Sequence, residues 1–375
     1  MRILGIDEAG RGPAIGPMIM AGVLYDEKMD EALKKMGIRD SKRLTSKRRE
    51  SLEMRIKKSV ERYWIVEVPV SLIDRKNLNT LEIESTASII NEADTDRVFL
   101  DAPVAGSGID KYIKRVREIA RKETAITAEN HADDIYPCVS AASILAKVER
   151  DRIIKKLQER YGDFGSGYPG DDKTRKFIPE WHKFPDIVRK RWSPVREAMV
   201  RRGRIMILGE KDTGKTELAR QLVNIGIDKG MEVGVLDLDP GQSHIGKPGT
   251  LGFGIACRKI RRLEQITPLV AYSIFSLSPN GCEKRILQGI EWMMERIPQV
   301  DLLIVDTSGY TKNMDFKKEK IRLINPDSVV FLERKNELEF LKKGLELRIY
   351  SVPVYEDVRK KSDRKRKVFR KKMGR

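Results

Sequence analysis

The chain alternates short apolar runs with longer amphipathic segments, and this alternation predicts a mixed α/β protein. Short runs rich in Val, Ile and aromatic side chains are typical of strands. In the first half they predict strands at 2–6, 17–25, 63–70, 97–101 and 124–130. Segments with helical periodicity predict helices at 45–60, 78–91, 109–121 and 139–161. The first half is therefore expected to be a mixed α/β layer structure.

The pattern breaks at residues 199–203 and then starts again with a buried strand. The second half predicts strands at 204–208, 232–239, 268–275, 301–306, 328–333 and 347–354, with helices at 216–229 and 280–297 and a short helix before the last strand. Such alternation is typical of a largely parallel, doubly wound sheet. We expect two domains, 1–198 and 204–358, a linker at 199–203 and a basic tail or lid at 359–375.

Composition adds a polyanionic partner to this picture. A length of 375 residues exceeds the usual size of a single core. The chain holds 74 Lys and Arg against 56 Asp and Glu, a net charge of +18, and the segment 359–375 alone has eleven basic residues and one Asp. A basic chain of this kind favours nucleic acid as its partner.

Cysteine, histidine and apolar content exclude several other classes. The three cysteines and three histidines show no paired spacing, which argues against a zinc site and a disulfide framework and fits a reducing compartment. No apolar run approaches the length of a membrane helix, and the first residues lack a signal-peptide pattern. The sequence therefore predicts a soluble, cytoplasmic protein without a membrane partner. It identifies no obligate protein partner.

Carboxylates follow three of the predicted strands of the first half. Asp7 and Glu8 come directly after the run 2–6, Asp101 ends the run 97–101, and Asp133 follows the run 124–130. Taken alone, an acidic pair after a strand is most often a solvated turn. If the strands are neighbours in one sheet, however, the four acids converge. Converging acids repel one another, and two divalent cations would turn them into a site for displacement at phosphorus.

The strings around these acids resemble the successive motifs of ribonuclease HII. They are "GIDEAGRGPAIGP", "DSK" at 40–42, "NLNTLE", "FLDAP", "HADDIYPCVSAASILAKVERD" and "FGSGYPGD", in order over about residues 1–196. The resemblance implies a ribonuclease-H-like fold that cleaves the RNA strand of RNA–DNA hybrids and cuts at ribonucleotides embedded in duplex DNA. It implies that Mg²⁺ or Mn²⁺ is held by four catalytic acids, namely Asp7, Glu8, Asp101 and Asp133.

The same resemblance assigns residues to the substrate. It implies that Gly10, Arg11 and Gly12 read the 2′-hydroxyl through backbone groups, which agrees with the close approach that glycine permits. Tyr168 resembles the tyrosine that stacks near the RNA–DNA junction, and Lys42 and Lys147 resemble phosphate contacts.

Two features of this half leave alternatives open. Archaeal relatives typically carry Lys where this chain has His131. Asp134 offers a second carboxylate beside Asp133, although motif position favours Asp133 as the ligand. A ribonuclease HI-like or repair endonuclease remains a second interpretation, which the Gly-Arg-Gly string and "SAASILAK" disfavour.

The second half opens with a phosphate-binding loop. The string "GEKDTGKT" at 209–216 follows a predicted strand and precedes a predicted helix, as the G-x-x-x-x-G-K-[ST] pattern requires. Gly209 and Gly214 allow the loop to wrap phosphates with its N–H groups. Lys215 neutralises the β- and γ-phosphates, and Thr216 binds Mg²⁺. The sequence therefore predicts binding of ATP with Mg²⁺.

The string "VGVLDLDPGQSHIGKPGT", with "SPNG" and "DTSGY", resembles polynucleotide 5′-hydroxyl kinases of RNA processing. The resemblance implies that Asp239 is the general base for a 5′-hydroxyl RNA or DNA end and that lid arginines, matched best by Arg359 and Arg364, reach the transferred phosphate. Two alternatives stay open: a catalytically inactive P-loop module that binds nucleotide or nucleic acid, and an unrelated ATPase of the deviant or partitioning type. Asp237, two residues earlier on the same predicted strand, is a further acid that could bind Mg²⁺.

Overall fold

The computed structural model describes residues 1–38, 44–310 and 313–358, and its chain divides into two compact units. The N-terminal unit comprises Met1–Phe177 and Asp186–Arg189, and the C-terminal unit comprises Ile178–Pro185 and Lys190–Arg375. Residues 178–185 and 190–198 thus group with the C-terminal unit, whereas the sequence pattern predicts them in the first domain. The ring of Trp181 stacks on that of Tyr350 at 5.0 Å, which is one reason for this grouping.

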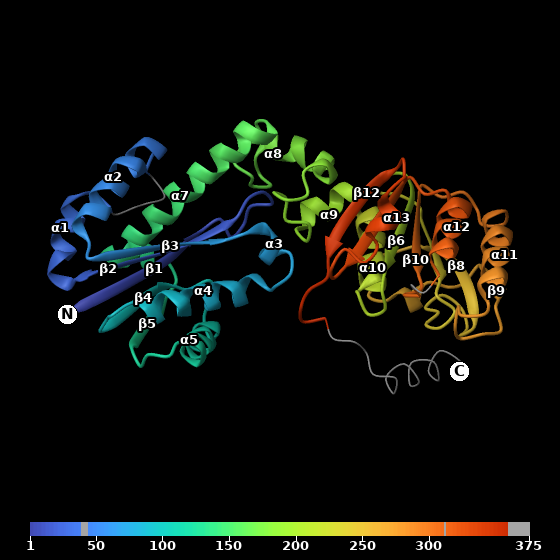
Figure 1. Cartoon of the computed structure of the whole chain (residues 1–375), viewed down its shortest axis with the longest axis horizontal. Coiled ribbons are helices and arrows are strands. Elements are labelled where there is room, and N and C mark those ends of the chain that lie inside the picture. The colour runs from blue at the N-terminus through green and yellow to red at the C-terminus, as the bar shows by residue number, and fades with distance from the viewer. Residues whose placement is uncertain (39–43, 311–312, 359–375) are drawn as a thin grey trace. The chain divides into compact units, whose positions relative to one another are not determined.

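The N-terminal unit is built on a mixed five-stranded sheet (Figure 1). Its order is β3-β2-β1-β4-β5, with β1 antiparallel to β2 and parallel to β4. The strands are β1 (Arg2–Ala9), β2 (Met18–Asp26), β3 (Arg62–Val68), β4 (Arg97–Asp101) and β5 (Ala125–Glu129). Because β4 and β5 run parallel to β1, their carboxyl ends meet at the edge of the sheet where the predicted acids lie.

Helices cover both faces of this sheet. The long helix α7 (Pro137–Tyr161) lies on one face with α1 (Asp30–Lys35) and α2 (Ser46–Ser59), while α4 (Leu78–Glu92) and α5 (Gly108–Ile119) lie on the other (Figure 1). The remaining helices are α3 (Val70–Ile73), α6 (Ala132–Ile135) and α8 (Asp172–Phe177). A Cβ atom on Gly5 of β1 would lie 2.2 Å from the carbonyl carbon of Cys138, so glycine lets the start of α7 pack directly on the strand.

The C-terminal unit contains a seven-stranded sheet in the order β12-β11-β6-β10-β7-β8-β9. The first five strands in this order are parallel, and β8 and β9 are antiparallel additions at one edge. The strands are β6 (Gly203–Gly209), β7 (Val233–Leu238), β8 (Thr250–Ala256), β9 (Val270–Ser273), β10 (Leu302–Thr307), β11 (Ser328–Glu333) and β12 (Arg348–Pro353). The predicted fold class, a mixed sheet followed by a largely parallel one, is confirmed.

Helix α10 (Lys215–Asp228) covers one face of this sheet, and α11 (Glu283–Met294) and α12 (Met314–Ile324) cover the other. The short helices are α9 (Ser193–Met199) and α13 (Glu339–Lys342). The sequence pattern did not predict β8 or α12. β8 contains two glycines, which weaken a strand pattern, and α12 has a dense run of lysines that resembles a solvated segment.

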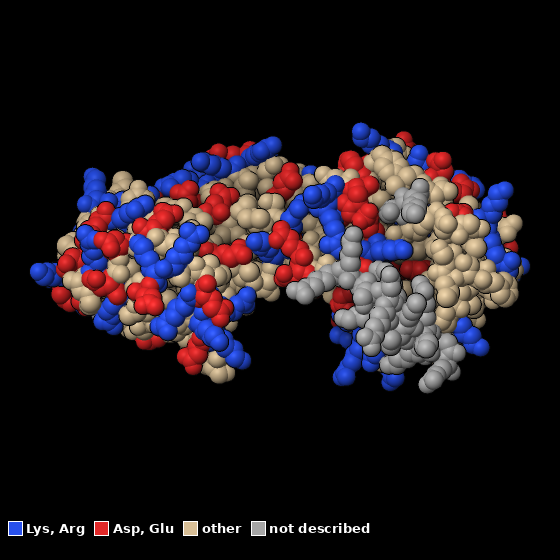
Figure 2. Space-filling view, turned by 60° about the horizontal axis from the view of Figure 1, so that its bottom comes forward, with Lys and Arg blue, Asp and Glu red and all other residues tan. Residues whose placement is uncertain are grey.

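The surface of the N-terminal unit mixes both signs of charge. Blue and red side chains alternate over the face of that unit shown in Figure 2. Among the described residues, no helix is long and apolar enough to cross a membrane.

Candidate functional site

Asp7 and Glu8 lie inside β1, not after it, which corrects the expectation of a strand that ends at these acids. The parallel ladder between β1 and β4 stops at the pair Ile6 and Leu100, whereas the antiparallel ladder to β2 continues to Ala9. The two acids therefore keep backbone partners on β2 and stand just beyond the parallel ladder. This position holds the two carboxylates on a rigid strand at the point where β4 ends.

Three of the four predicted acids converge at this edge. Carboxylate oxygens of Asp7, Glu8 and Asp101 lie within 4.8 Å of one another. Asp7 hydrogen bonds to Ser143 of α7 and accepts the N–H of Glu8 at 2.7 Å. Asp101 accepts the N–H of Ala132, the first residue of α6, at 2.8 Å. Strand β1, the end of β4 and the start of α6 thus fix the positions of these acids.

Asp133, the fourth predicted acid, belongs to another group of side chains. It is buried in α6, and its carboxylate lies within 4.8 Å of potential ligand atoms of His131 and Asp134. His131 has a left-handed backbone with φ of 61° and is exposed. The structure therefore groups Asp133 with Asp134 and His131, and links α6 to Asp101 through the backbone of Ala132.

Burial and mutual repulsion make these acids hard to ionise. Burial, followed by the charge of Glu8, raises the pKa of Asp7 well above its usual value. Burial and the nearby Glu82 raise the pKa of Glu8 to about 8. Burial also raises the pKa of Glu82 to about 7, although Arg11 opposes the shift. A cluster of oxygen donors with excess negative charge fits hard divalent cations such as Mg²⁺ or Mn²⁺.

Glu82 is a site residue to which sequence reasoning assigned no role. It lies on α4, is 1 % exposed, and forms an ion pair with Arg11, which also donates to the side chain of Asn79 at 2.7 Å. Glu82 ends the string "NLNTLE", which resembles a motif of the family. Helical periodicity places it on a helix but does not identify the residues that it contacts.

The loop from Gly10 to Gly12 is held by buried arginines. The guanidinium of Arg189 donates to the carbonyls of Gly10 at 2.6 Å, Arg11 at 2.9 Å and Gly16 at 2.9 Å. Gly10 has φ of +91°, and a Cβ atom there would lie 2.5 Å from Nε of Arg150. Because an arginine side chain fills the space, only glycine fits this turn.

Tyr168 lies against the same loop. A Cβ atom on Gly12 would sit 3.5 Å from the Tyr168 ring, which is 42 % exposed. The guanidinium carbon of Arg150 is 5.2 Å from the centre of that ring, and Arg150 also donates to the carbonyls of Ile15 and Ser166 at 3.4 and 3.3 Å. The structure thus brings the glycine loop and Tyr168 together through Arg150.

Of the two lysines predicted to contact phosphates, the structure describes one. Lys147 lies on α7 one turn beyond Ser143, the residue that bonds to Asp7, and it is partly buried. Lys42 lies outside the described residues.

The predicted phosphate loop joins β6 to α10. Gly214, at the start of α10, has φ of +90°, and Nζ of Lys215 donates to the carbonyl of Glu210 within the loop at 2.6 Å. The hydroxyl of Thr216 donates to Asp306 at the end of β10 at 2.7 Å. Burial lowers the pKa of Lys215, while Asp306 opposes the shift. The loop is therefore built around a buried lysine and a Thr–Asp pair.

Asp306 is the second site residue that sequence reasoning missed. It is 2 % exposed, and burial raises its pKa while Lys215 and Thr216 oppose the shift. The signal was present in "DLLIVD", an apolar run that ends on an acid, but the earlier predicted strand 232–239 offers two other acids for the same role.

Asp237 and Asp239 have different environments. Asp237 is fully buried and accepts the backbone N–H groups of Asp239, His244 and Ile245 at 3.0, 2.5 and 3.2 Å, so it shapes the loop that follows β7. Asp239 accepts the N–H groups of Gly241 and Gln242 and lines a cavity. Of the two acids, Asp239 is the one exposed to that cavity.

This cavity has a volume of about 750 Å³ and joins the phosphate loop to three other loops of the C-terminal unit. Residues 211–217 line it together with Asp239, the segment 276–279, the segment 307–310 and Val358. A Cβ atom on Gly309 would lie 2.5 Å from the backbone nitrogen of Lys211, so glycine lets the loop after β10 touch the phosphate loop. Arg359 and Arg364 lie outside the described residues.

Two lysines on α12 are buried close to Lys215. Lys317 and Lys320 are 0 % exposed, and neither Nζ has a hydrogen-bond partner among the described residues. Burial lowers the pKa of Lys320 to about 8; the Asp239 carboxylate opposes this shift and Lys215 adds to it. Lys320 also lies over the Phe316 ring at 4.5 Å.

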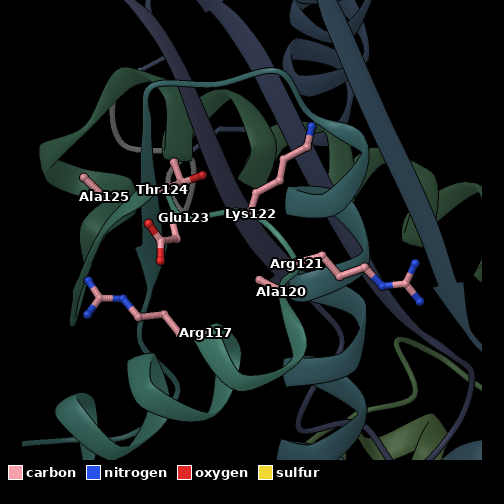
Figure 3. A pocket seen from close by; sticks show the side chains of 7 residues that line it. All are labelled: Arg117, Ala120, Arg121, Lys122, Glu123, Thr124 and Ala125. Carbon is pink, nitrogen blue, oxygen red and sulfur yellow. The ribbon is translucent and has the colours of Figure 1, made fainter.

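A second hollow lies at the other end of the N-terminal sheet. It has a volume of about 710 Å³ and lies between the end of α5 and the start of β5 (Figure 3). In Figure 3 the side chains of Arg117 and Arg121 point in different directions, and Nζ of Lys122 donates to the carbonyl of Ala93. No predicted site residue lines this hollow, so we assign it no role.

Comparisons with known proteins cover both units. Residues 4–195 match the family described as "Ribonuclease HII", and residues 209–375 match the family described as "mRNA cleavage and polyadenylation factor CLP1 P-loop". Both resemblances drawn from the sequence are thereby confirmed at the level of the family.

Individual relatives match the first half. The chain is 43% identical over 203 residues to ribonuclease HII of Thermococcus kodakarensis, covering 52% of this chain and 89% of the relative. It is 44% identical to that of Pyrococcus furiosus, covering 52% and 91%. The crystal structure of ribonuclease H2 from Pyrococcus horikoshii OT3 is 36% identical with a TM-score of 0.49, covering 53% of this chain and 97% of that one.

Proposed function

The chain belongs to the ribonuclease HII family, and from this premise we propose that its N-terminal unit is a metal-dependent endonuclease. It hydrolyses the RNA strand of RNA–DNA hybrids and cuts at ribonucleotides embedded in duplex DNA. The observation that carries this proposal is the convergence of Asp7, Glu8 and Asp101 within 4.8 Å at one edge of the sheet.

Asp7, Glu8, Asp101 and Asp133 would hold the divalent ions. Bound Mg²⁺ or Mn²⁺ would supply an activated water and stabilise charge on the leaving oxygen. The protein contributes rigid placement: β1 carries two of the acids, β4 the third, and the N–H of Ala132 orients Asp101. The oxygen-only donor set and the raised pKa of Glu8 support this role, because a cation relieves the repulsion among the acids.

We propose that the glycine loop selects ribonucleotides. Gly10, Arg11 and Gly12 present backbone groups to the 2′-hydroxyl, and Arg189 holds two of their carbonyls so that the loop keeps one conformation. Tyr168 stacks near the RNA–DNA junction, while Lys147 and Lys42 contact phosphates of the duplex. The contact between Gly12 and the Tyr168 ring supports a shared site.

A duplex DNA with one embedded ribonucleotide tests this function. With Mg²⁺ or Mn²⁺ the full chain is expected to cut this duplex and to leave an all-DNA duplex intact. Asp133→Asn is expected to abolish cleavage, and Asp134→Asn, its neighbour on α6, is the matched control that should retain it. Cleavage of both duplexes at equal rates would contradict selection by the glycine loop.

For the C-terminal unit we propose ATP-dependent phosphorylation of 5′-hydroxyl ends of RNA or DNA. Lys215, Gly209 and Gly214 bind the phosphates of ATP, Thr216 and Asp306 serve its Mg²⁺, and Asp239 accepts the proton of the attacking hydroxyl. Support comes from the 750 Å³ cavity, which Asp239 and the phosphate loop line together. Arg359 and Arg364 would reach the transferred phosphate as lid residues.

One observation favours a second function for this unit, a module that binds nucleotide or nucleic acid without catalysis. Nζ of Lys215 is bonded to the carbonyl of Glu210 in its own loop and must leave that bond to reach phosphates. ATP labelled at the γ-phosphate, mixed with 5′-hydroxyl RNA and DNA, separates the two functions. Label on either strand that is lost in Lys215→Ala and retained in Lys318→Ala, at an exposed lysine of α12, supports the kinase; ATP binding without label supports the module.

A further inference from the structure

Phe275 combines two unfavourable features. It lies in the loop between β9 and α11, its side chain is 80 % exposed, and its backbone is left-handed with φ of 61°. A side chain other than glycine in this conformation costs about 1 kcal/mol or more. The ring gains little burial to offset this cost, so the packing of the C-terminal unit does not explain why phenylalanine occupies this position.

The backbone of this loop is firmly held. The N–H groups of Ile274 and Phe275 both donate to the carbonyl of Gly249, at 2.8 and 3.2 Å. The Ile274 side chain is 2 % exposed and belongs to the core of the unit. The neighbouring residue therefore anchors the loop, and the Phe275 ring is presented to solvent on a fixed support.

The loop that carries Phe275 forms a wall of the nucleotide cavity. The four residues that follow it, 276–279, line the cavity together with the phosphate loop and Asp239. A Cβ atom on Gly241 would lie 2.7 Å from the carbonyl of Leu277, so this wall touches the loop of Asp239. In addition, the Tyr310 hydroxyl donates to the Asn280 side chain at 3.2 Å.

The order of the strands places Phe275 on the same side of the phosphate loop as Asp239, the proposed base for the acceptor hydroxyl. In the order β12-β11-β6-β10-β7-β8-β9, the phosphate loop follows β6, Asp239 follows β7 and Phe275 follows β9. The cavity residue Val358 follows β12, at the other end of the order. Phe275 is thus on the same side as the proposed base for the acceptor hydroxyl.

Arg285 completes an arrangement that suits a nucleobase. Its guanidinium carbon is 4.8 Å from the centre of the Phe275 ring, and its Nε donates to the carbonyl of Ser273 at 3.1 Å. An exposed aromatic ring beside a guanidinium is the combination that binds bases of single strands, since every base has a π-face. Figure 2 shows a broad area without charged side chains on the side of this unit that carries β8 and β9.

We propose that Phe275 and Arg285 bind the base at the 5′ end of the acceptor strand by stacking. This inference rests on the proposed kinase function and adds a substrate class: single-stranded or frayed 5′-hydroxyl ends, with little preference among the four bases. A blunt duplex end, whose terminal base is already stacked, binds more weakly at this position.

Phe275→Gly is the decisive variant because it removes the ring and also relieves the left-handed backbone. Its melting temperature is expected to equal or exceed that of the wild type, while KM for a 5′-hydroxyl oligonucleotide rises about tenfold and KM for ATP stays the same. Phe275→Trp should retain the wild-type KM. Phe340→Ala, at an exposed phenylalanine of α13, is the matched control and should change neither KM.

An unchanged oligonucleotide KM in Phe275→Gly would overturn the proposal. So would a rise in KM for ATP alone, which would assign the ring to the adenine base. A fall in melting temperature together with equal losses in every substrate would assign Phe275 a structural role, which also overturns it.

A binding measurement separates this inference from the kinase function. A 5′-hydroxyl oligonucleotide with 2-aminopurine at its first position should lose fluorescence on binding to the full chain, and the loss should disappear in Phe275→Gly. The same fluorophore at the fifth position serves as the control. Quenching that depends on Phe275 without transfer of phosphate would refute the kinase and support the stacking site. Phosphate transfer with quenching independent of Phe275 would refute the stacking site alone.

Discussion

At Asp7 and Glu8, folding removes two carboxylates from water and places them beside a third. The free energy of ionising them in the folded chain is therefore higher than in the unfolded chain, as the raised pKa of Glu8, about 8, indicates. A protein that keeps such a cluster gives up stability at neutral pH. A divalent cation held there, as proposed above, would restore this stability and so couple folding to metal affinity at these residues.

We predict that Asp7→Asn abolishes cleavage of a duplex with one ribonucleotide and leaves ATP binding intact. In EDTA its melting temperature is expected to exceed that of the wild type by a few degrees, because one repelling charge is removed. Cleavage assays and thermal unfolding measure the two effects. A variant that cuts at the wild-type rate would remove Asp7 from the mechanism.

The pKa of Glu8 predicts how stability depends on pH. Between the ordinary value of 4.5 and about 8, the folded state binds more protons at Glu8 than the unfolded state does. Stability in EDTA should therefore fall as pH rises through this window, and binding of Mn²⁺ at pH 7 should release protons. Thermal unfolding at pH 5 to 8 and proton release in weak buffer test this. Glu8→Gln should flatten the stability profile and reduce the release.

Among the site residues, the sequence predicts those that sit on strong local patterns. Asp7, Glu8 and Asp101 follow apolar strand residues, and the phosphate loop has a fixed spacing. Glu82 and Asp306 escape prediction of a role because their partners, Arg11 and Thr216, are distant in the chain. Contacts of this kind depend on which strands and helices become neighbours, which local patterns do not contain.

Helix α12 shows how a buried charge alters an element. Its buried face is formed by Phe316, Lys317, Lys320, Ile321 and Ile324, so lysine occupies two positions where apolar residues are normal. Burial with Lys215 nearby lowers the pKa of Lys320 to about 8, because the charged form loses hydration and is repelled. The helix therefore packs less favourably than its apolar positions alone would allow.

We predict that Lys320→Met stabilises the chain at pH 7 by up to about 3 kcal/mol, since each pKa unit corresponds to about 1.4 kcal/mol. In the wild type the pKa of Lys320 is lower in the folded chain than in the unfolded chain. The loss of folding stability caused by burying its charge is therefore full below pH 8 and fades as pH rises toward 10.5. The difference between variant and wild type should shrink over that range. Denaturant unfolding measures it, with Lys318→Met, on the exposed face, as the control that should show little change.

The link between α7 and Tyr168 gives a further prediction at this scale. Arg150 of α7 bonds to the carbonyls of Ile15 and Ser166 and lies over the Tyr168 ring. Arg150→Lys should let the Tyr168 ring move and reduce cleavage at a single ribonucleotide severalfold. The same substitution made in a Tyr168→Ala chain, which has no ring, should reduce cleavage less. A double-mutant cycle measures this coupling. Additive losses would show that Arg150 acts independently of Tyr168.

At the level of elements, the strands of the N-terminal unit are predicted more fully than those of the C-terminal unit. β1 to β5 are apolar runs bounded by polar segments, whereas β8 has glycine at positions 252 and 254. A Cβ atom at Gly252 would lie 1.7 Å from the carbonyl of Ile245, so close packing there excludes the side chains that identify a strand.

For the whole molecule, the sequence predicts two α/β units in the right order but not the way the chain passes between them. The chain enters the C-terminal unit at residue 178, returns to the N-terminal unit for Asp186–Arg189, and leaves it again at residue 190. The reason is specific: the Arg189 guanidinium binds carbonyls of the glycine loop, and Trp181 stacks on Tyr350. Both partners are remote in sequence.

Truncation tests this arrangement. A chain ending at residue 189 is expected to retain cleavage, because it keeps the acids, the glycine loop and Arg189. A chain ending at residue 177 should lose at least tenfold in cleavage, since the carbonyls of Gly10 and Arg11 lose their buried donor. Cleavage of a ribonucleotide-containing duplex compares the two. Equal activity would show that Arg189 is dispensable for the loop.

The stacking of Trp181 on Tyr350 links the two family segments of the chain and limits how each could be exchanged for a relative. Trp181 falls inside the segment 4–195 that matches one family, while Tyr350 belongs to the segment 209–375 that matches another. Each ring is fully buried. Loss of either ring leaves the other without its stacking partner, so a different ribonuclease HII joined to this P-loop domain would need a ring at the position of Trp181 to fill the same buried space.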